Sequence, residues 1–301
     1  MKKFDLVRHA FFVFSGFGLA AVVIDLWSRR RLSIVSWLLI IIIGTGLLTL
    51  VDMYFIEPNW LAVERITVHD EGLAGRMQGL SAVQISDLHL RGKGSFLEKR
   101  LVAKVNALQP DLLLITGDFL DDIDRLRETI ELLRSFKVKV GIYGVLGNTD
   151  HHFFRTQGLI KELQDAGITI LLNENRRVSL PNGRHLWLAG VDDPVTGRAR
   201  LEQSLTGIPA GEPVLLLAHS PDIHVQAVLA QVNMVLAGHT HGGQVGIPYL
   251  IRRSDYANRS PFMAGLFHDG STTLYVNRGI GTKTLPIRFL CRPEITTFQF
   301  R

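Results

Sequence analysis

Aspartate, asparagine and histidine residues follow five apolar runs of the sequence, each at the point where the run ends. Asp-x-His and His-x-His place two donors on the same side of an extended chain, because side chains alternate with a period of two. Carboxylate, amide and imidazole groups in this number are typical of a site that binds divalent metal ions. Each motif alone is common in turns, so the prediction of a metal site depends on the ordered set. The motifs are Asp87-Leu88-His89, Gly117-Asp118, Gly147-Asn148-Thr149-Asp150, His219-Ser220-Pro221 and Gly238-His239-Thr240-His241-Gly242-Gly243.

Hydrolysis assisted by two cations is the chemistry that such a set can support. Two divalent ions ~3.5–4 Å apart need several donors and one carboxylate that bridges them. Imidazole and carboxylate suit zinc, manganese and iron, so the sequence predicts two divalent metal ions (Mn, Zn or Fe) without naming the element. A glycine before a ligand lets the backbone turn sharply and approach the site. The single cysteine, Cys291, excludes an intrachain disulfide and a cysteine-based zinc site.

From about Leu61 onward, short apolar runs alternate with amphipathic stretches, which predicts an α/β fold. Five of the predicted strands end in the motifs above. In open α/β sheets the carboxyl ends of the strands form the ligand-binding edge, so we expect these side chains to converge there. The predicted strands are residues 80–86, 111–116, 138–146, 168–172, 185–191, 213–218, 234–237, 272–276 and 294–300. The predicted helices are residues 96–108, 123–136, 159–166 and 223–230, with the acidic residues Asp121, Asp122 and Asp124 opening the second.

Two apolar stretches precede this region. Residues 32–51 form 20 residues without a charge, which at ~1.5 Å per residue matches the ~30 Å hydrocarbon core of a bilayer. Residues 10–27 are a second candidate with Asp25 near the end; a signal peptide is the alternative, but no small-residue cleavage site follows. We predict a membrane anchor over residues 1–56, with transmembrane helices at about 10–27 and 32–54, and a catalytic domain over residues 57–301.

The composition agrees with a chain that lies partly in lipid. Hydrophobic residues make up 47% of the chain and charged residues 20%, and the net charge of +5 suits an anionic membrane surface or a phosphate-bearing substrate. Because no Lys/Arg stripe is interleaved with aromatic residues, we expect no nucleic-acid partner. The positive-inside rule for a two-span hairpin favours a catalytic domain on the cytoplasmic face of a bacterial inner membrane, whereas a single span reverses the orientation. The charges that decide this are Lys2, Lys3, Arg8 and Arg65 on one side and Arg29, Arg30 and Arg31 on the other.

The ordered motifs resemble those of the calcineurin-like metallophosphoesterase superfamily. Residues 238–244, residues 275–281 and the segment Glu57-Pro58-Asn59-Trp60 are similar to its small bacterial membrane-associated branch. The resemblance covers roughly residues 57–301 and implies a four-layer α/β/β/α sandwich with the metals at the edge of two sheets. It implies a dinuclear site in which one metal is held by Asp87, His89 and His241, the other by Asn148, His219 and His239, and both by Asp118.

The third motif departs from the family pattern. The family has Gly-Asn-His-Asp or Gly-Asn-His-Glu, and its histidine contacts the substrate phosphate and helps to protonate the leaving group. Thr149 stands in that position, and a threonine hydroxyl cannot act as a general acid near neutral pH. Together with Asn148 and Asp150, Thr149 is a candidate catalytic residue, and His151 is the candidate substitute for the histidine unless it is an exposed loop residue.

We therefore predict a metal-dependent hydrolase that cleaves a phosphate ester or pyrophosphate bond, with in-line attack by a water or hydroxide between the metals, as the resemblance implies. The anchor would hold the site near lipid headgroups, which favours a lipid-linked substrate. A missing general acid costs less when the leaving group is good, which favours nucleotide-linked lipids. Two alternatives stay open: a non-catalytic binding module on the same fold, and a broad-specificity phosphodiesterase that acts on soluble substrates.

Overall fold

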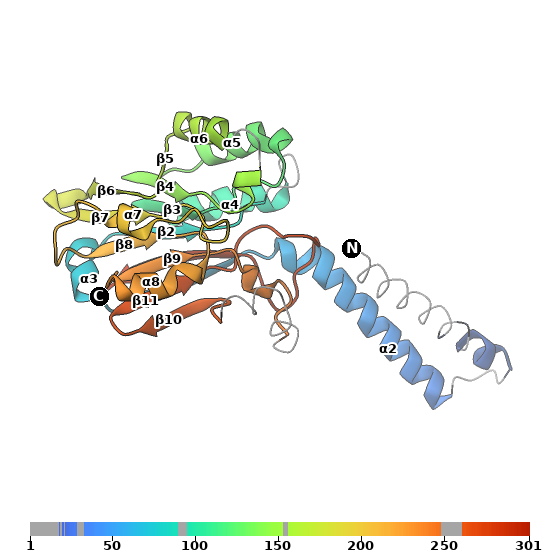
Figure 1. Cartoon of the computed structure of the whole chain (residues 1–301). Helices are drawn as coiled ribbons and strands as arrows, with labels where there is room; N and C mark the ends of the chain where they lie inside the picture. The colour runs from blue at the N-terminus through green and yellow to red at the C-terminus, as the bar shows by residue number, and fades with distance from the viewer. Residues whose placement is uncertain are drawn as a thin grey trace.

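Two six-stranded sheets form the centre of the protein (Figure 1). The computed structural model describes residues 18, 20, 22–28, 33–89, 95–152, 156–247 and 261–301. The first sheet has the order β1-β12-β2-β3-β4-β5, with β1 at Ala62–Val68, β2 at Ala82–Ile85, β3 at Leu112–Thr116, β4 at Gly141–Val145, β5 at Ile168–Ile170 and β12 at Glu294–Phe300. The second has the order β10-β11-β9-β8-β7-β6, with β6 at Glu174–Ser179, β7 at His185–Gly190, β8 at Val214–Leu217, β9 at Met234–Ala237, β10 at Gly265–Asp269 and β11 at Thr272–Val276.

Parallel strands occupy the middle of both sheets and determine where the polar motifs meet. In the first sheet β2, β3, β4 and β5 run parallel, and in the second β7, β8, β9 and β11 do so. Strands such as β3 and β8 are buried along their whole length, which is why they read as continuous apolar runs. Antiparallel pairing is found between β12 and β2 and at the β6–β7 and β10–β11 ends of the second sheet.

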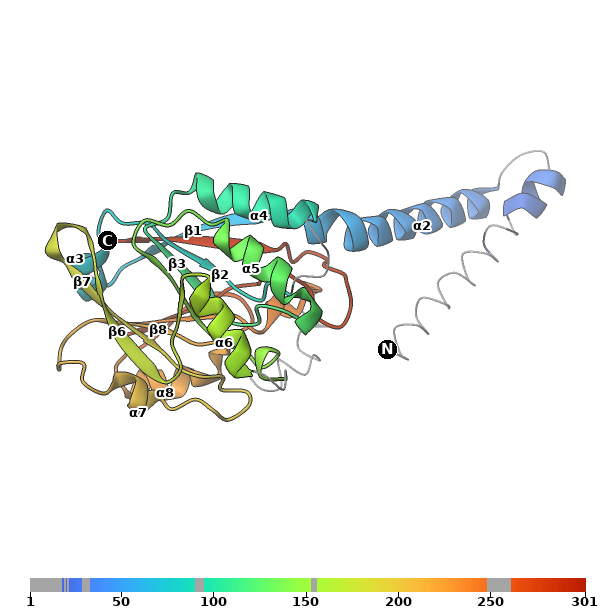
Figure 2. The same ribbon diagram turned by 90° about the horizontal axis from the view of Figure 1, so that it is seen from above.

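Helices cover the outer faces of the sheets, which confirms the predicted four-layer α/β/β/α sandwich. One apolar core lies between the sheets and contains residues such as Leu114 and Leu217. A second core joins the first sheet to α4 (Phe96–Ala107), α5 (Leu126–Arg134) and α6 (Thr156–Asp165), which Figure 2 shows lying across that sheet. A third joins the second sheet to α7 (Leu201–Leu205) and α8 (His224–Leu229).

The predicted elements agree with the structure except at the sheet edges and in two short helices. All nine predicted strands and all four predicted helices are present, with ends shifted by a few residues. The strands β1, β6 and β10, which each end a sheet, and the helices α3 (Glu71–Met77) and α7 were not predicted. The short 3-10 helices are η2 (Glu57–Asn59), η3 (Ile123–Arg125), η4 (Asp150–His152), η5 (Pro181–Gly183), η6 (Pro221–Ile223) and η7 (His241–Gly243), and η1 (Asp52–Ile56) is a π-helix.

A long apolar helix projects from the domain (Figure 1). It consists of α2 (Ile34–Val51), η1 and η2, and the continuous segment Ile34–Asn59 is long and apolar enough to span a membrane. Much of the first predicted span, residues 10–27, lies outside the described residues. The described residues 22–28, at its end, are helical. The end of the long helix is tied to the domain because the buried Glu57 carboxylate accepts hydrogen bonds from the backbone N–H groups of Leu290 (2.8 Å) and Cys291.

Candidate metal centre

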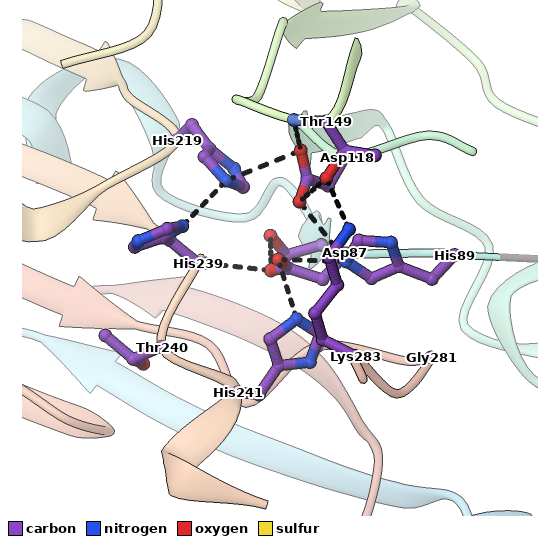
Figure 3. A network of polar contacts seen from close by, with 12 residues as sticks. Asp87, His89, Asp118, Thr149, His219, His239, Thr240, His241, Gly281 and Lys283 are labelled. Atoms are coloured by element: carbon purple, nitrogen blue, oxygen red, sulfur yellow. Dashed lines mark hydrogen bonds and ion pairs between the residues drawn. The ribbon is translucent and has the colours of Figure 1, made fainter. Parts of the chain in front are cut away.

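Seven predicted ligand side chains from both sheets meet at the carboxyl ends of the parallel strands. Figure 3 shows six of them, all except Asn148, turned toward one another. Five are buried and two, Asn148 and His239, are partly exposed, and the loops that carry all seven belong to strands at the centres of the two sheets. Asp87 and His89 follow β2, Asp118 follows β3, Asn148 follows β4, His219 follows β8, and His239 and His241 follow β9.

Asp87, His89 and His241 form one half of the cluster. One ligand atom from each lies within 4.8 Å of the others, a spacing that can hold a metal ion. Asp87 Oδ1 is 3.3 Å from Nε2 of His241 and 3.8 Å from Nε2 of His89. The two imidazole rings stack with their centroids 5.0 Å apart, so both present their edges to the same carboxylate.

The other half contains Asn148, His219 and His239. Nε2 of His219 lies 3.1 Å from Asn148 Oδ1 and 3.1 Å from Nδ1 of His239. Asp118 stands between the halves, because its Oδ2 is 3.2 Å from Nε2 of His89 and its Oδ1 is 3.6 Å from Nε2 of His219. Each carboxylate oxygen therefore faces one half, which is the position a bridging ligand needs.

The hydrogen bonds around the imidazoles direct their free nitrogens into the cluster. Nδ1 of His89 lies 2.7 Å from Asp121 Oδ1, and Nδ1 of His219 lies 2.8 Å from the Thr116 carbonyl oxygen. Both acceptors fix a proton on Nδ1 and leave Nε2 as the donor atom, as outer partners of metal-bound histidines do.

Several buried atoms of the cluster have no hydrogen-bond partner within the described part of the chain. They are Asp87 Oδ1, Nε2 of His89 and Nδ1 of His241. Leaving a buried polar atom unpaired costs roughly 1–3 kcal/mol, so three in one place need an explanation. A bound cation would satisfy Asp87 Oδ1 and Nε2 of His89, and the donor set of imidazoles, carboxylates and one amide fits a divalent metal.

The two central carboxyl groups are ionised in this environment. Burial alone would raise the pKa of Asp87 and Asp118. For Asp87, the electrostatic interactions with the nearby imidazoles of His241 and His89 outweigh burial and hold its pKa well below the usual range. For Asp118, the charge of His219 has the same effect. Both carboxylates are therefore ready to bind cations.

The four imidazoles divide into two pairs. Burial lowers the pKa of His239 to about 4 and that of His241 to about 3, so these rings are neutral, as metal ligands must be. Burial also acts on His89 and His219, but Asp118 outweighs it and raises the pKa of both rings. Cation binding to either ring therefore competes with its protonation.

The backbone of the cluster adopts a conformation that side chains usually avoid. Positive φ angles occur at Asp87 (49°), His89 (39°), Asp118 (52°), His239 (69°) and His241 (51°). Such strain persists only where the surrounding structure enforces it, and it gathers at functional sites. The positive φ angles of five of the seven cluster residues are therefore a second indication, independent of the side-chain contacts, that this is a functional site.

Comparison with known proteins identifies the family of this chain. A family model described as calcineurin-like phosphoesterase matches residues 80–243, the region that contains all seven cluster residues. The chain belongs to the calcineurin-like phosphoesterase family. It is accordingly a metal-dependent hydrolase of phosphoester bonds, as predicted, and its substrate bears phosphate.

Three relatives illustrate the membership. The phosphoesterase is 32% identical to the uncharacterized metallophosphoesterase YkuE of Bacillus subtilis, over 82% of this chain and 88% of that protein. It is 35% identical to a transmembrane protein with metallophosphoesterase domain of Danio rerio, over 77% of this chain and 55% of that protein, so it spans about half of that relative. It is 28% identical to the phosphodiesterase YaeI of Escherichia coli, over 82% of this chain and 91% of that protein.

Residues of the third motif of the phosphoesterase hold parts of the cluster in place through hydrogen bonds. The Thr149 N–H and hydroxyl groups donate to the two oxygens of Asp118, each at 2.8 Å. The buried Asp150 carboxylate accepts from the backbone N–H groups of Phe119 (3.0 Å) and Gly147 (2.9 Å), and burial raises its pKa to about 7. Asp150 thus ties two ligand loops together rather than facing the cluster.

His151, the predicted substitute for the family histidine, makes a different contact. Its Nε2 lies 2.5 Å from Asp192 Oδ1, in the loop after β7, and both side chains are largely buried. Within the described residues no contact joins His151 to the seven cluster side chains. His151 is therefore held away from the cluster by its contact with Asp192.

Two residues near the cluster were not predicted as parts of the site. Asp121 was expected to help open a helix, but that expectation was wrong, because Asp122 is the N-cap of η3 and Asp121 contacts His89 instead. Lys283 approaches the cluster from the loop between β11 and β12, and its Nζ lies 3.0 Å from Asp121 Oδ1. Neither residue belongs to a motif of recognisable spacing.

Proposed function

We propose that the phosphoesterase uses two divalent metal ions to cleave a phosphate ester or pyrophosphate bond in a lipid-linked substrate at a membrane. The observation that carries this proposal is the convergence of seven candidate ligand side chains on one edge of the sandwich. Asp87, His89 and His241 would hold one ion, and Asn148, His219 and His239 the other, with Asp118 between them. Divalent ions supply charge stabilisation and lower the pKa of a water molecule toward neutrality.

The residues of the chain orient this site and hold its charge. Asp121 and the Thr116 carbonyl fix the rings of His89 and His219, so that little reorganisation is needed when ions bind. Thr149 holds both oxygens of Asp118 in place. Because Thr149 cannot donate a proton near neutral pH, we propose that the substrate has a good leaving group, as a nucleotide-linked lipid has.

A small pocket supports a lipid-linked substrate. It has a volume of about 200 Å³ and lies between the end of the long helix, represented by Tyr54 and Pro58, and the cluster residue His89. Its walls are mainly apolar and include Leu97, Leu101, Ile280 and Pro286. An apolar pocket that touches both the membrane helix and the metal centre suits the first methylene groups of a lipid whose phosphate lies at the metals.

The surface around the end of the helix also suits a membrane interface. Phe55 is 72% exposed and Trp60 is 51% exposed, as aromatic residues at the headgroup level of a bilayer are. The Arg292 guanidinium stacks on the Trp60 ring at 4.2 Å and would meet anionic headgroups. These contacts would hold the metal centre close to the lipid surface.

Hydrolysis of an aryl phosphodiester by the detergent-solubilised full chain tests the proposed metal-dependent catalysis. We expect activity with manganese, zinc or iron that disappears with chelator and in Asp118→Ala. Asp165→Ala, which removes a half-exposed aspartate at the end of α6, is the matched control and should behave as wild type. Absence of both activity and bound metal would instead favour the non-catalytic binding module.

The proposal of a lipid-linked substrate is tested with two compounds that differ only in the presence of acyl chains. We expect faster cleavage of a long-chain lipid phosphate or pyrophosphate in nanodiscs than of the same headgroup without chains. Leu97→Asp should reduce only the reaction with the long-chain compound, whereas Leu229→Asp, at an 81% exposed position on α8, should reduce neither. Equal rates on both compounds would support the broad-specificity phosphodiesterase.

We also propose that residues 1–56 form the anchor, that residues 57–301 form the catalytic domain, and that this domain lies on the cytoplasmic face of a bacterial inner membrane. The support is the apolar helix Ile34–Asn59 and the distribution of the N-terminal basic residues. Protease treatment of intact spheroplasts measures the orientation. Protection of a C-terminal tag is expected, and its cleavage would place the domain on the outer face.

A further inference from the structure

Lys283 is a cation that reaches into the site without belonging to any sequence motif. Its side chain extends from the loop after β11 toward Asp118 and Thr149 (Figure 3). Nζ lies 2.9 Å from Thr149 Oγ1 and 3.0 Å from Asp121 Oδ1. One third of the side chain is exposed, so the ammonium group stands at the boundary between the cluster and solvent.

The direction of each hydrogen bond follows from the groups involved. The Thr149 hydroxyl donates to the ionised Asp118 Oδ2, so its oxygen is the acceptor for Lys283. A lysine ammonium has three N–H donors, and Thr149 and Asp121 take two. The third has no acceptor in the part of the chain that the structure describes. One N–H of Lys283 is therefore available to a ligand at the mouth of the site.

The loop that carries Lys283 is attached to the ligand loop after β9. The Gln244 side chain accepts a hydrogen bond from the Lys283 backbone N–H and donates to the carbonyl oxygens of Leu285 and Ile287, each at 3.2 Å. Gln244 follows the His-x-His motif by three positions and has a positive φ of 58°. The position of Lys283 is thus fixed by the same backbone that places His239 and His241.

We infer that Lys283 binds a non-bridging phosphoryl oxygen of the substrate, and that it supplies the phosphate contact that Thr149 cannot make. This inference rests on the proposed function, because it requires a phosphate at the metal centre. The Thr149 hydroxyl is engaged by Asp118, and the Lys283 ammonium contacts the same hydroxyl oxygen at 2.9 Å. A fixed cation at this point would stabilise the negative charge that grows on the phosphoryl oxygens.

A purely structural role is the alternative, in which Lys283 only neutralises Asp121 and so steadies His89. The two roles differ in what they change. Loss of a phosphate contact lowers the rate and the affinity for phosphate but leaves the metal in place. Loss of support for His89 lowers the metal content, and Asp121→Asn should reproduce it.

The test compares Lys283→Met, Lys283→Arg and Lys139→Met in the full chain loaded with manganese. Lys139 is a matched control because it also pairs with an aspartate, Asp111, but precedes β4 at the opposite end of the sheet. We expect Lys283→Met to lower kcat/KM on an aryl phosphodiester by about 10²-fold. It should also weaken inhibition by inorganic phosphate at least tenfold, with the manganese content unchanged. Lys283→Arg should recover most of both, and Lys139→Met should match wild type.

Two results would overturn the inference while the wild type remains active: unchanged kinetics and phosphate inhibition in Lys283→Met, or a loss of manganese that Asp121→Asn reproduces. A wild type that binds manganese but hydrolyses nothing is a different outcome. It would refute the proposed function itself, and the inference with it.

Discussion

Gly238, which follows β9 of the second sheet, lies against Ser86 and Asp87, which follow β2 of the first sheet. A Cβ atom at this position would be 1.9 Å from Ser86 Oγ and 2.5 Å from Asp87 Oδ2. Ser86 cannot simply rotate away, because its Oγ is buried and lies 2.6 Å from Asp87 Oδ2 and 3.2 Å from the Thr116 carbonyl oxygen. Gly238→Ala must therefore displace Asp87, and with it the hydrogen bond that Asp87 accepts from the His239 N–H at 2.9 Å.

The size of this effect follows from the cost of forcing a methyl group into a packed site. Overpacking costs ~1–3 kcal/mol, which for a domain of this size lowers the melting temperature by roughly 2–12 °C. Because Asp87 is one of the proposed ligands, Gly238→Ala should also lower the manganese content and the hydrolytic rate. Thermal unfolding with and without manganese, together with metal analysis, measures both consequences.

Gly75 provides the matched control. It is an exposed glycine within α3, and a Cβ there would meet nothing within 4 Å. Gly75→Ala should leave activity unchanged and stabilise the protein by up to ~1 kcal/mol through helix propensity. If Gly238→Ala retained the wild-type metal content and melting temperature, the close approach of the sheets at Asp87 would be refuted.

Three further predictions concern the anchor, the third motif and the metal. Glu57→Ala leaves the buried N–H groups of Leu290 and Cys291 without their acceptor, so the melting temperature should fall by roughly 4–8 °C for a loss of ~2 kcal/mol; an unchanged value would contradict the attachment. Thr149→Val removes the hydroxyl that holds Asp118 and should lower kcat/KM about tenfold, whereas Thr149→Ser should retain it. Chelation should lower the melting temperature, because ligand binding at 100 times Kd stabilises by ~2.7 kcal/mol; manganese should restore it in wild type but far less in Asp118→Ala.

The sequence predicted that these motif side chains converge on one edge of the sandwich, because parallel strands impose a simple rule. Each buried strand ends at the same edge, so a polar residue directly after an apolar run is placed there without further information. The rule applied to Asp118 after β3 and to His219 after β8, which lie on different sheets but come within 3.6 Å. Lys283 follows no such rule, since it lies in a loop 134 positions from Thr149.

The parts of the fold that the sequence did not predict have physical reasons of their own. Edge strands such as β6, with the sequence ENRRVS, face solvent and lack the apolar pattern of a central strand. The position of β12, from the end of the chain, between β1 and β2 depends on long-range pairing that local patterns do not contain. Asp121 was assigned to a helix start because its neighbours are acidic, and only the structure shows its contact with His89.

Anomalous scattering from crystals of the manganese-loaded protein tests the central claim most directly. Two peaks roughly 3.5–4 Å apart are expected, with the Asp118 carboxylate in contact with both. The remaining ligands should divide as Asp87, His89 and His241 around one peak and Asn148, His219 and His239 around the other. A single peak, or manganese bound away from these side chains, would contradict the account.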